Sequence, residues 1–544
     1  MKYFTFSSFF AKIIIFLFPY ALLASSDHTH EHFLQCLTTR ISNLTSTNET
    51  IIYTQNDASY STVLNSSIQN QRFNTESTAK PFAIITPLNV SHIQVTVYCS
   101  QKHGMLIKVR SGGHDYEGLS YVSNQLPFII LELRNLSSIS VDAEGKSAWV
   151  QAGATLGEVY YWVANKTGNI LGFPAGGCGS VGVGGHLGGG GYGYLARKYG
   201  LAADNVVDAV IIDAQGRILD RNSMGEDLFW AIRGGGAASF GIVVAWKLRL
   251  VPVPSTVTVF KVPRDMADDA TKKLVHRWQR RAHKVDEDLT IFIRFLTVNS
   301  TDKKGNKKIV IQPNFMTTFL GGADTLLQLM QKEFPEMGLV REDCTELTYV
   351  QSFQYFYAQG NGSLDVLLDR TTQFNDLAFK VKSDYVKEPI PDDVLKGMLE
   401  RMYDEEVGRV LIDFYPYGGE MNNFSESAIP FPHRAGNIFN IHYQVTWKGE
   451  SKKHLSWIRR LYNSMTPYMS KNPRTAYLNF RDLDIGMNEK RSNTTSTLTR
   501  IAKANIWGTK YFKNNFNKLI QVKTKVDPAD FFRNEQSIPS LLSP

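Results

Sequence analysis

Short apolar runs that end at glycine or proline turns recur along the first half of the chain. Each run has the length of a buried strand, whereas the stretch from Val90 to Ser100 carries apolar residues at helical spacing. The runs predict strands at Ile84–Thr86, Leu106–Arg110, Phe128–Leu133, Ala148–Ala152, Val206–Ile212 and Ile242–Leu250. Strands and helices mixed in this way predict an α+β domain that ends near Pro252.

The pattern changes after this point. Between residues 253 and 475, apolar strands alternate with helical stretches such as Ala323–Phe334 and His454–Met465, charge is higher and glycine is rarer. We interpret this part as a second domain that lays a sheet over the first, which occupies residues 26–252. The tail, residues 476–544, is rich in Asn and Phe, and we expect it to pack back onto the body. A chain of 544 residues is also too long for one ordinary core.

The N-terminus predicts entry into the secretory pathway. Residues 1–25 combine Lys2 and Lys12 with the apolar run Ile13–Ala24, which has the length of a signal peptide. The alternative is a short membrane anchor, but no later segment approaches the ~20 apolar residues that a spanning helix needs. Asn-x-Ser/Thr triplets predict a glycosylated surface; they begin at Asn43, Asn48, Asn65, Asn89, Asn135, Asn165, Asn299, Asn361, Asn423 and Asn493.

Composition excludes some classes of protein. Hydrophobic residues make up 43% of the chain and charged residues 20%, as in a folded globular protein. The net charge of +8 comes from 59 basic and 51 acidic residues. The basic residues form only short clusters, such as Lys303–Lys304, rather than one stripe, so we expect no nucleic-acid partner.

The four cysteines have different expected roles. In an oxidising compartment, Cys36 and Cys99 are a candidate disulfide that ties the mature N-terminus to the first domain. Cys344 is expected to be a buried free thiol. Cys178 lies in a glycine-rich loop and needs its own explanation.

Glycine is concentrated in that loop, because 11 of the 41 glycines lie between Gly176 and Gly193. Glycine lets a backbone approach a ligand closely and present N–H groups to a pyrophosphate. The loop is neither a Walker A sequence nor a Rossmann fingerprint. A second glycine turn, Arg110–His114, delivers a histidine directly after a strand. Each turn thus carries a side chain of a kind known to attach covalently to a flavin ring, an imidazole or a thiolate.

Several long segments resemble the plant berberine bridge enzyme-like family. They include RSGGHDYEGLSY, VGVGGHLGGGGYGYLARKYGLAADNVVDA, DLFWAIRGGGAASFGIVVAWKLRL, YPYGGEM, PHRAGN and FFRNEQSIP, and the resemblance runs from about Cys36 to Pro539. Within this family, the chain is most similar to the branch of cannabinoid-acid synthases and related mulberry-type oxidases and Diels–Alderases. The resemblance implies a two-domain vanillyl-alcohol-oxidase fold. Its PCMH-type FAD-binding core would span about residues 78–252, its substrate domain would be built on an antiparallel sheet, and residues 476–544 would form a berberine-bridge-type segment.

The same resemblance implies FAD held by two covalent bonds, from His114 to the flavin 8α-methyl and from Cys178 to C6. Val181 matches the position thought to gate oxygen, and a small valine there favours an oxidase over a dehydrogenase. Tyr477 and Asn479 resemble positions that face the isoalloxazine ring. The other expected cofactor-binding residues are Arg110, Ser111, Gly112, Gly113, Gly182, Gly184, Gly185, His186, Gly189, Gly190, Tyr192, Asn205 and Val243.

The chain also departs from its family. Gly179 stands where the family commonly has proline, which predicts a looser loop. Phe480 stands where the cannabinoid-acid synthases carry a tyrosine base, and a phenyl ring cannot take a proton. His442 is then the best remaining base, because its ordinary pKa lies near the operating pH; a hydrogen-bonding role in a sheet is the alternative.

Two further residues are expected at the substrate. Tyr417 matches a substrate-facing tyrosine. Arg294 lies within an apolar strand, where an arginine is unfavourable unless it is paired or ligand-bound. It is expected to anchor a phenolate or carboxylate, and the alternative is a paired structural arginine.

These features predict a monomeric, secreted FAD oxidase of plant specialised metabolism, located in the apoplast or vacuole and without a metal. Its aromatic substrate, phenolic, prenylated or alkaloid, would lose hydride to flavin N5, and O₂ would reoxidise the flavin to give H₂O₂. The alternative is a Diels–Alderase that retains FAD without net redox, because such a site needs no base. A weaker alternative is a carbohydrate oxidase.

Overall fold

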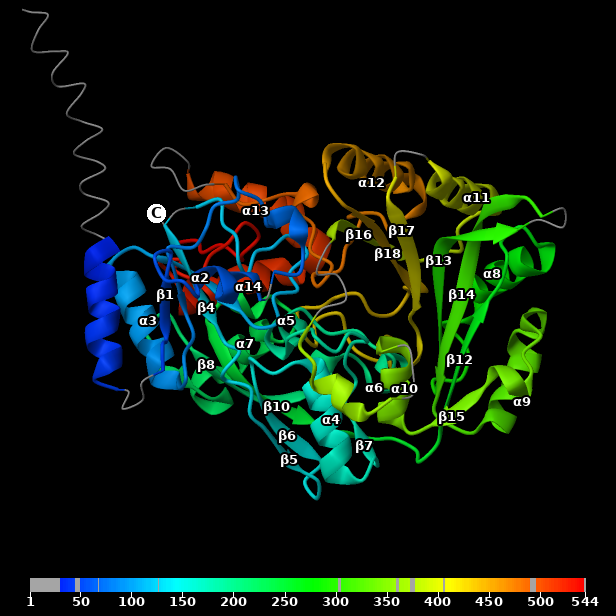
Figure 1. The fold of residues 1–544 in the computed structure, drawn as a ribbon, viewed down its shortest axis with the longest axis horizontal. Coiled ribbons are helices and arrows are strands. Elements are labelled where there is room, and N and C mark those ends of the chain that lie inside the picture. Colours follow the sequence, from blue (N-terminus) through cyan, green and yellow to red (C-terminus); the bar gives the residue numbers. More distant parts are fainter. Residues whose placement is uncertain are drawn as a thin grey trace, which may run out of the picture.

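A seven-stranded sheet occupies one side of the molecule and two smaller sheets occupy the other (Figure 1). The computed structural model describes residues 30–44, 49–66, 68–125, 127–301, 305–358, 362–371, 377–404, 407–489 and 496–542. The expected signal peptide and three sequon asparagines, Asn48, Asn361 and Asn493, lie outside these residues. The other seven sequon asparagines are all exposed.

The first part of the chain forms the two smaller sheets. The first sheet has the order β1-β2-β4-β3 and includes parallel pairs of β4 with β2 and β3. The second is antiparallel, with the order β5-β6-β10-β8-β9. The strands of these sheets are β1 (Ile52–Thr54), β2 (Ala83–Ile85), β3 (Leu106–Arg110), β4 (Phe128–Glu132), β5 (Ile139–Asp142), β6 (Ser147–Gln151), β8 (Val206–Ile212), β9 (Ile218–Leu219) and β10 (Ile242–Arg249).

Helices and a short strand pair complete this part. Its helices are residues 30–42, α2 (Tyr60–Asn65), α3 (Val90–Lys102), α4 (Leu156–Thr167), α5 (Val183–Gly188), α6 (Ala196–Tyr199) and α7 (Arg221–Ile232). A two-stranded ladder joins β7 (Leu171–Gly172) to β11 (Val251–Pro252). The strands and helices predicted from the sequence coincide with the observed elements to within a few residues, and the α+β class is confirmed.

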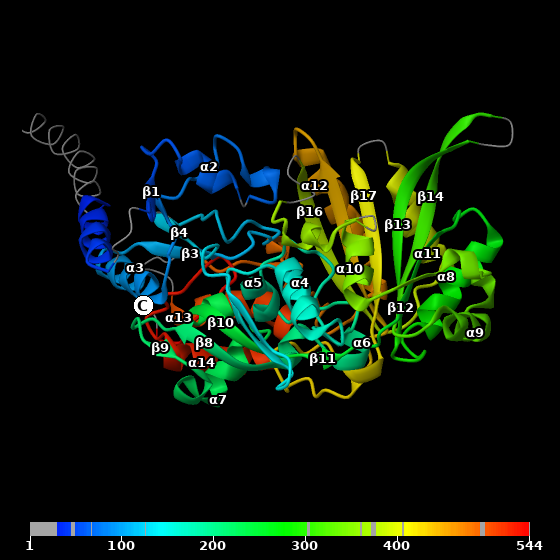
Figure 2. The same ribbon diagram turned by 60° about the horizontal axis from the view of Figure 1, so that its bottom comes forward.

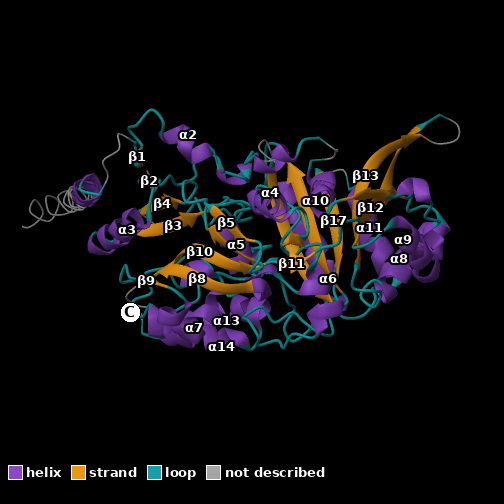
Figure 3. Ribbon diagram, turned by 90° about the horizontal axis from the view of Figure 1, so that it is seen from below, coloured by secondary structure: helices purple, strands orange, loops and turns teal. Residues whose placement is uncertain are grey.

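The large sheet is antiparallel throughout, with the order β15-β12-β14-β13-β17-β18-β16. Its strands are β12 (Val257–Pro263), β13 (Leu289–Thr301), β14 (Lys307–Phe319), β15 (Thr345–Leu347), β16 (Ala378–Val386), β17 (Arg409–Pro416) and β18 (Phe439–Trp447). Helices α8 (Asp269–Arg281), α9 (Ala323–Glu333), α11 (Asp392–Glu400) and α12 (Lys452–Ser464) share a core with one face of the sheet. Figures 2 and 3 show α8, α9 and α11 on the side that faces away from the rest of the molecule.

Alternation along the strands separates the two faces of this sheet. Ile293, Ile412 and Ile441 point into the core beneath the helices. The residues next to them in sequence point to the opposite face, which looks toward the first part of the chain. That inner face is therefore free to carry a site.

The tail returns to the first part of the chain. Its helices α13 (Thr497–Phe512) and α14 (Asn515–Val526) pack against each other, and α14 packs against α7. The tail shares the core of the first part, as does α10 (Tyr349–Tyr357), which packs on α4. Within the residues described, no helix combines the length and apolar character needed to cross a membrane.

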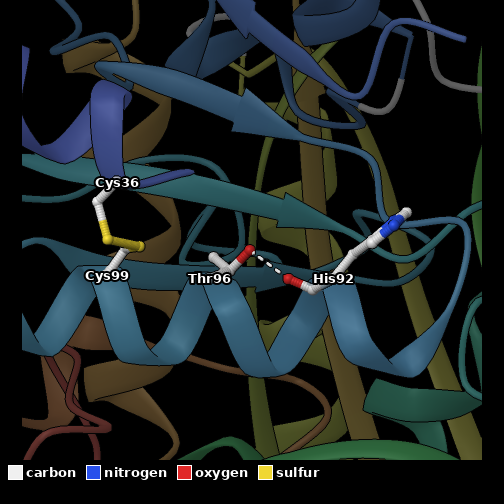
Figure 4. The surroundings of a disulfide bond; sticks show 4 residues. All are labelled: Cys36, His92, Thr96 and Cys99. Carbon is white, nitrogen blue, oxygen red and sulfur yellow. Dashed lines mark hydrogen bonds between the residues drawn. A yellow bond between two sulfur atoms is a disulfide. The ribbon is translucent and has the colours of Figure 1, made fainter. Parts of the chain in front are cut away.

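The predicted disulfide is confirmed. Cys36, in the helix of residues 30–42, bonds to Cys99 of α3 with an S–S distance of 2.01 Å (Figure 4). The bond links positions 63 residues apart and fastens the first described helix to the smaller sheets. Cys344 is buried and free, as expected, and Cys178 is also free.

A buried cluster of charges joins the three parts of the chain. Lys380 and Lys382 of β16 both bind Asp482 of the tail, each at 2.6 Å. Lys380 also binds Glu117 from the first part, and Lys382 lies 3.0 Å from Asp484. Burial alone would raise the pKa of Asp482, but the two lysines outweigh it and lower that pKa below its usual value.

Replacing Asp482 with asparagine should destabilise the protein. Asp482→Asn leaves two buried ammonium groups without their shared partner, and we expect it to lower the free energy of unfolding by about 3 kcal/mol at pH 7. Because the folded-state pKa is depressed, the stabilisation exists above the unfolded pKa of about 4 and is lost as pH falls further. The difference between variant and wild type, measured by urea unfolding, should shrink below that pH.

The exposed pair of Lys272 and Asp269 supplies the control. Asp269→Asn should leave the urea midpoint unchanged, because an exposed pair is screened by solvent. An equal effect of the two substitutions would contradict the role given to the buried cluster.

Candidate functional site

A cavity of about 490 Å³ lies between the inner face of the large sheet, the two glycine turns and the tail. The inner face contributes alternate residues of β13, β17 and β18, such as Arg294, Asp413 and His442. The tail contributes Phe480 and residues around Asn534. The cavity is thus walled by segments from all three parts of the chain.

The two glycine turns meet backbone to backbone. A β-carbon added to Gly112 would lie 2.3 Å from the amide nitrogen of Gly182, and one added to Gly182 would lie 2.1 Å from Ser111 Oγ. Gly113 follows with φ +70°, a conformation that favours glycine. Only glycine at these positions lets the turns touch and form one floor.

His114 and Cys178 stand on that floor, one from each turn, and both line the cavity. His114 Nε2 shares a hydrogen bond of 3.0 Å with Ser180 Oγ, which leaves Nδ1 without a partner among the described residues. Burial lowers the pKa of His114 to about 4. Burial also raises the pKa of the Cys178 thiol, and hydrogen bonding by Ser180 only partly offsets this.

Tyr477 and Asn479 support the glycine loop from the tail side. The Tyr477 hydroxyl accepts hydrogen bonds from the amides of Gly191 and Tyr192, at 2.9 and 3.1 Å, and from Asn479 Nδ2 at 3.0 Å. Asn479 Nδ2 also donates to His186 O. The backbone amide of Tyr477 in turn donates to Ser383 Oγ at 3.0 Å. The tail therefore connects the floor of the cavity to strand β16.

Three charged or titratable residues lie side by side on the inner face of the sheet. Arg294 is paired in register with Asp413, and Asp413 with His442. Arg294 Nε and Nη2 each donate to the Asp413 carboxylate at 2.8 Å. Tyr415 donates its hydroxyl to Asp413 Oδ2 at 2.9 Å. The structure thus gives Arg294 a bidentate carboxylate partner, which is the paired alternative for this residue.

The electrostatics of this group differ from the expectation for His442. Burial alone would raise the pKa of Asp413, but Arg294, His442 and the Tyr415 hydroxyl outweigh it and lower the pKa. Burial lowers the pKa of His442 to about 4, well below the value expected from its sequence. His442 Nδ1 is buried 3.9 Å from Asp413 Oδ2 and has no hydrogen-bond partner in the described part of the chain. The group therefore consists of an ion pair beside a neutral imidazole.

Aromatic rings form the remaining walls. Phe480 stacks on Tyr116, with ring centroids 5.9 Å apart and an angle of 9° between the ring planes. Phe480 also makes an edge contact with His442, and the centroids of these two rings are 4.6 Å apart. Phe292 packs edge-on against Tyr415 with ring centroids 5.3 Å apart. These rings present flat apolar surfaces on both sides of the polar group.

Four of the expected site residues do not line the cavity. Arg110 is buried, binds Glu132 and donates to the carbonyls of Val63 and Leu64, each at 2.9 Å. Its side chain therefore ties α2 to the first sheet. Asn205 donates to the carbonyls of Tyr199 and Leu201 and accepts from Arg249, which uses its side chain in local structure.

The other two corrections concern the wall behind the glycine loop. Tyr417 lies just beyond the end of β17, stacks on Tyr192 and donates its hydroxyl to Tyr385. A side chain at Gly190 would point at the Phe431 ring. Both positions support the loop from behind. The remaining expected residues line the cavity; they are Ser111, Gly112, Gly113, His114, Cys178, Val181, Gly182, Gly184, Gly185, His186, Gly189, Tyr192, Val243, Arg294, His442, Tyr477, Asn479 and Phe480.

Several residues of the site were not expected from the sequence, among them Tyr116, Ser180, Phe292, Asp413 and Tyr415. Tyr116 and Ser180 were detectable, because each lies two residues from an expected attachment residue. Asp413 and Tyr415 alternate with apolar residues in β17, and that alternation is a signal for an inward-facing polar side. The pairing of Asp413 with Arg294 was not detectable, since 119 residues separate them.

Two protein-family models match the chain. One is described as FAD binding domain and covers residues 81–222, and the other is described as Berberine and berberine like and covers residues 476–539. Tetrahydroberberine oxidase of Berberis wilsoniae is 52% identical over 525 residues, covering 96% of each chain. Cannabidiolic acid synthase-like 1 of Cannabis sativa is 50% identical over 538 residues, covering 97% of each. The chain belongs to the berberine bridge enzyme-like family.

Two solved structures of one grass pollen protein, Phl p 4, are similar to this chain. Phl p 4, described as a grass pollen allergen with glucose dehydrogenase activity, gives a TM-score of 0.85 at 42% identity, covering 94% of this chain and 100% of that chain. An isoleucine-to-valine variant of Phl p 4 is described as a glucose oxidase and gives the same TM-score and identity, covering 93% and 99%. Membership of the berberine bridge enzyme-like family confirms that this chain is an FAD-dependent oxidase of plant specialised metabolism.

The residues present fit FAD. The glycine floor brings backbone amides to the cavity, and Gly185 has open space where a side chain would stand. Gln69 Oε1 and Ser120 Oγ are buried at the cavity without hydrogen-bond partners in the described residues, as expected of groups that meet a polar ligand. No group of three metal-binding side chains occurs in the described ranges.

Separating the two glycine turns should abolish cofactor binding. Gly112→Ala would force a methyl group against the Gly182 amide, so we expect at least a tenfold loss of flavin per protein, measured by absorbance after purification. Gly397→Ala is the control, because its added methyl group on α11 meets no atom within 4 Å. Full flavin content in Gly112→Ala would refute the role of this contact.

Proposed function

We propose that this enzyme oxidises a small aromatic substrate by removing a hydride and passes the electrons to O₂, which becomes H₂O₂. One observation supports this best: a single cavity connects the glycine floor that bears His114 and Cys178 to the aromatic walls and polar group of the large sheet. FAD, when bound, is the hydride acceptor. The chain itself binds and orients both partners and manages a proton.

Aromatic stacking is the proposed basis of substrate selection. Tyr116, Phe292, Tyr415 and Phe480 all line the cavity, and their rings suit a flat, apolar molecule. The charge of Arg294 is balanced by Asp413, so neither is free to hold a charged substrate alone. The names of two relatives, tetrahydroberberine oxidase and cannabidiolic acid synthase-like 1, point to alkaloids or prenylated phenols as candidates.

Covalent attachment of FAD to both His114 and Cys178 is part of the proposal. His114 is unprotonated at neutral pH because its pKa is about 4, so its free Nδ1 can act as a nucleophile. Val181 lines the cavity three residues beyond Cys178 and is proposed to admit O₂. Phl p 4 has glucose dehydrogenase activity, whereas its isoleucine-to-valine variant is a glucose oxidase.

His442 is proposed as the proton acceptor. It is neutral and therefore available, whereas Phe480 has no acceptor atom. Its Nδ1 approaches the ionised Asp413, so a proton taken at Nε2 would leave an imidazolium that Asp413 stabilises. A buried carboxylate stabilises the imidazolium of a catalytic triad by the same electrostatic attraction.

Secretion is proposed on three grounds. The disulfide of Cys36 and Cys99 requires an oxidising compartment. The seven described sequon asparagines are exposed, as glycan acceptors must be. The apolar run of residues 13–24 completes the argument.

The Diels–Alder alternative rests on Phe480, since a site without its tyrosine needs no proton acceptor. A Diels–Alder reaction would also need a cation to polarise a dienophile carbonyl. Arg294 is the candidate, but its guanidinium already donates two hydrogen bonds to Asp413. The carbohydrate alternative rests on Phl p 4, but the cavity of this chain is lined by rings that suit an aromatic substrate. We therefore favour the oxidase.

Measuring O₂ uptake and H₂O₂ release during turnover of tetrahydroberberine and a set of prenylated phenols tests the proposal. One O₂ consumed and one H₂O₂ formed for every two electrons removed from the substrate is the expected result. An adduct formed from a diene and a dienophile without O₂ uptake would establish the pericyclase instead. Faster turnover of glucose or cellobiose than of any aromatic compound would establish the carbohydrate oxidase.

The pH profile of the reaction should report on His442. The group accepts a proton only when unprotonated, so kcat/KM should rise with pH through a pKa near 4 and stay flat from about pH 5 to 7. His442→Ala should lower kcat by at least about 10²-fold and remove this limb. His276→Ala, a substitution outside the cavity, should change neither. A limb near pH 6.5, or normal turnover by His442→Ala, would exclude His442 as the acceptor.

A further inference from the structure

Ser180 lies between the two side chains proposed to hold the cofactor. Its Oγ is 3.0 Å from His114 Nε2 and 3.7 Å from Cys178 Sγ. Ser180 is only 3% exposed. One hydroxyl therefore contacts both attachment residues, although 64 residues separate them in the sequence.

Backbone contacts hold the loop that carries this hydroxyl. The loop on either side of Ser180 is hydrogen-bonded to the start of α4, through Gly157 N to Gly179 O and Leu156 N to Val181 O, each at 2.9 Å. The expected loosening of the loop by Gly179 is thus opposed by these bonds.

Tyr357 covers the outer side of the same loop. A β-carbon on Gly179 would lie 2.8 Å from the Tyr357 ring, so glycine is needed for the ring to pack there. The Tyr357 hydroxyl also interacts with Ser180. Tyr357 is itself largely buried, and it shields the serine from bulk water.

The direction of the hydrogen bonds follows from the chemistry of the imidazole. Once Nδ1 of His114 carries a bond to carbon, the neutral ring has no N–H, and Nε2 can only accept. The Ser180 hydroxyl must then donate to Nε2. Its oxygen lone pairs remain for the Cys178 thiol, which donates S–H. A path for a proton runs from Sγ through Oγ to Nε2.

Cys178 needs such a path. Thiolate, not thiol, is the nucleophile, and burial raises the pKa of Cys178 so that the thiol form persists. The proton must therefore leave to a nearby group as the bond to carbon forms. Ser180 contacts His114, Cys178 and Tyr357, and of these only the imidazole of His114 offers a basic nitrogen.

We propose that Ser180 couples the two attachments: its hydroxyl relays the Cys178 proton to Nε2 of His114, so the cysteinyl bond depends on the histidyl bond and forms after it. In this step the S–H bond breaks and the bond from Sγ to flavin C6 forms. The thiol proton moves to Ser180 Oγ, and the hydroxyl proton of the serine moves to Nε2. The C6–H bond breaks as well, and the two electrons released pass to O₂, the oxidant of the proposed function. O₂ takes up the proton lost from C6 and the proton released again from Nε2, and H₂O₂ is the second product.

This inference rests on the proposed double attachment, and peptide masses test the two separately. The FAD-loaded full chain is digested, and the fraction of flavin that cross-links the His114 and Cys178 peptides is measured. In wild type we expect the cross-linked form to dominate. In Ser180→Ala we expect at least a tenfold lower cross-linked fraction, with flavin retained on the His114 peptide.

Two variants serve as controls for the serine. Ser180→Thr keeps a hydroxyl and should restore the cross-link. Ser100→Ala removes a buried hydroxyl outside the cavity and should match wild type, because Ser100 Oγ has no hydrogen-bond partner among the described residues.

The order of the bonds gives a second test that does not depend on the folding of Ser180→Ala. Cys178→Ala should keep the histidyl bond, whereas His114→Ala should lose the cysteinyl bond as well. A wild-type cross-link in Ser180→Ala, or a normal cysteinyl bond in His114→Ala, would overturn the coupling alone. Absence of flavin from both peptides in wild type would overturn the double attachment and the coupling with it.

Discussion

The register of the large antiparallel sheet determines the chemistry of the site. Arg294, Asp413, His442 and Ser383 lie directly opposite one another on β13, β17, β18 and β16. A slip of one residue would turn these side chains toward the helices and bring isoleucines into the cavity. Ser383 then extends the row into the tail by accepting from the amide of Tyr477. One row of strand pairing thus sets both the polar group and the support of the glycine loop.

Charge at the substrate end of the cavity is balanced before any ligand arrives. Arg294 and Asp413 neutralise each other, and burial keeps His442 neutral. In the proposed reaction, recognition then relies on ring contacts and shape, and the ionised carboxylate would stabilise a proton taken up by His442. This arrangement keeps acid–base chemistry available without attracting charged competitors from solution.

The sequence predicted those features that depend on the local pattern of residues. It did not predict those that depend on pairing between distant segments. Strands such as β3 and β8 were predicted with their observed bounds, because apolar runs ended by turn residues leave few alternatives. The pairing of Arg294 depended on a partner that only the sheet brings near. Tyr417, which was expected at the substrate from the resemblance, follows the end of β17 at Pro416 and does not line the cavity. The pKa of His442 depended on burial, which no single segment reveals.

The tail has a consequence for the biosynthesis of the enzyme. Residues near Tyr477, Phe480 and Asn534 wall a cavity whose floor is made by Gly112 and Gly182, far earlier in the chain. During synthesis the floor leaves the ribosome hundreds of residues before this wall does. The cavity with both its floor and its tail wall can therefore form only after nearly all of the chain has been synthesised. A protein truncated by its last tenth would keep His114 and Cys178 and still lack part of the cavity wall, including Asn534.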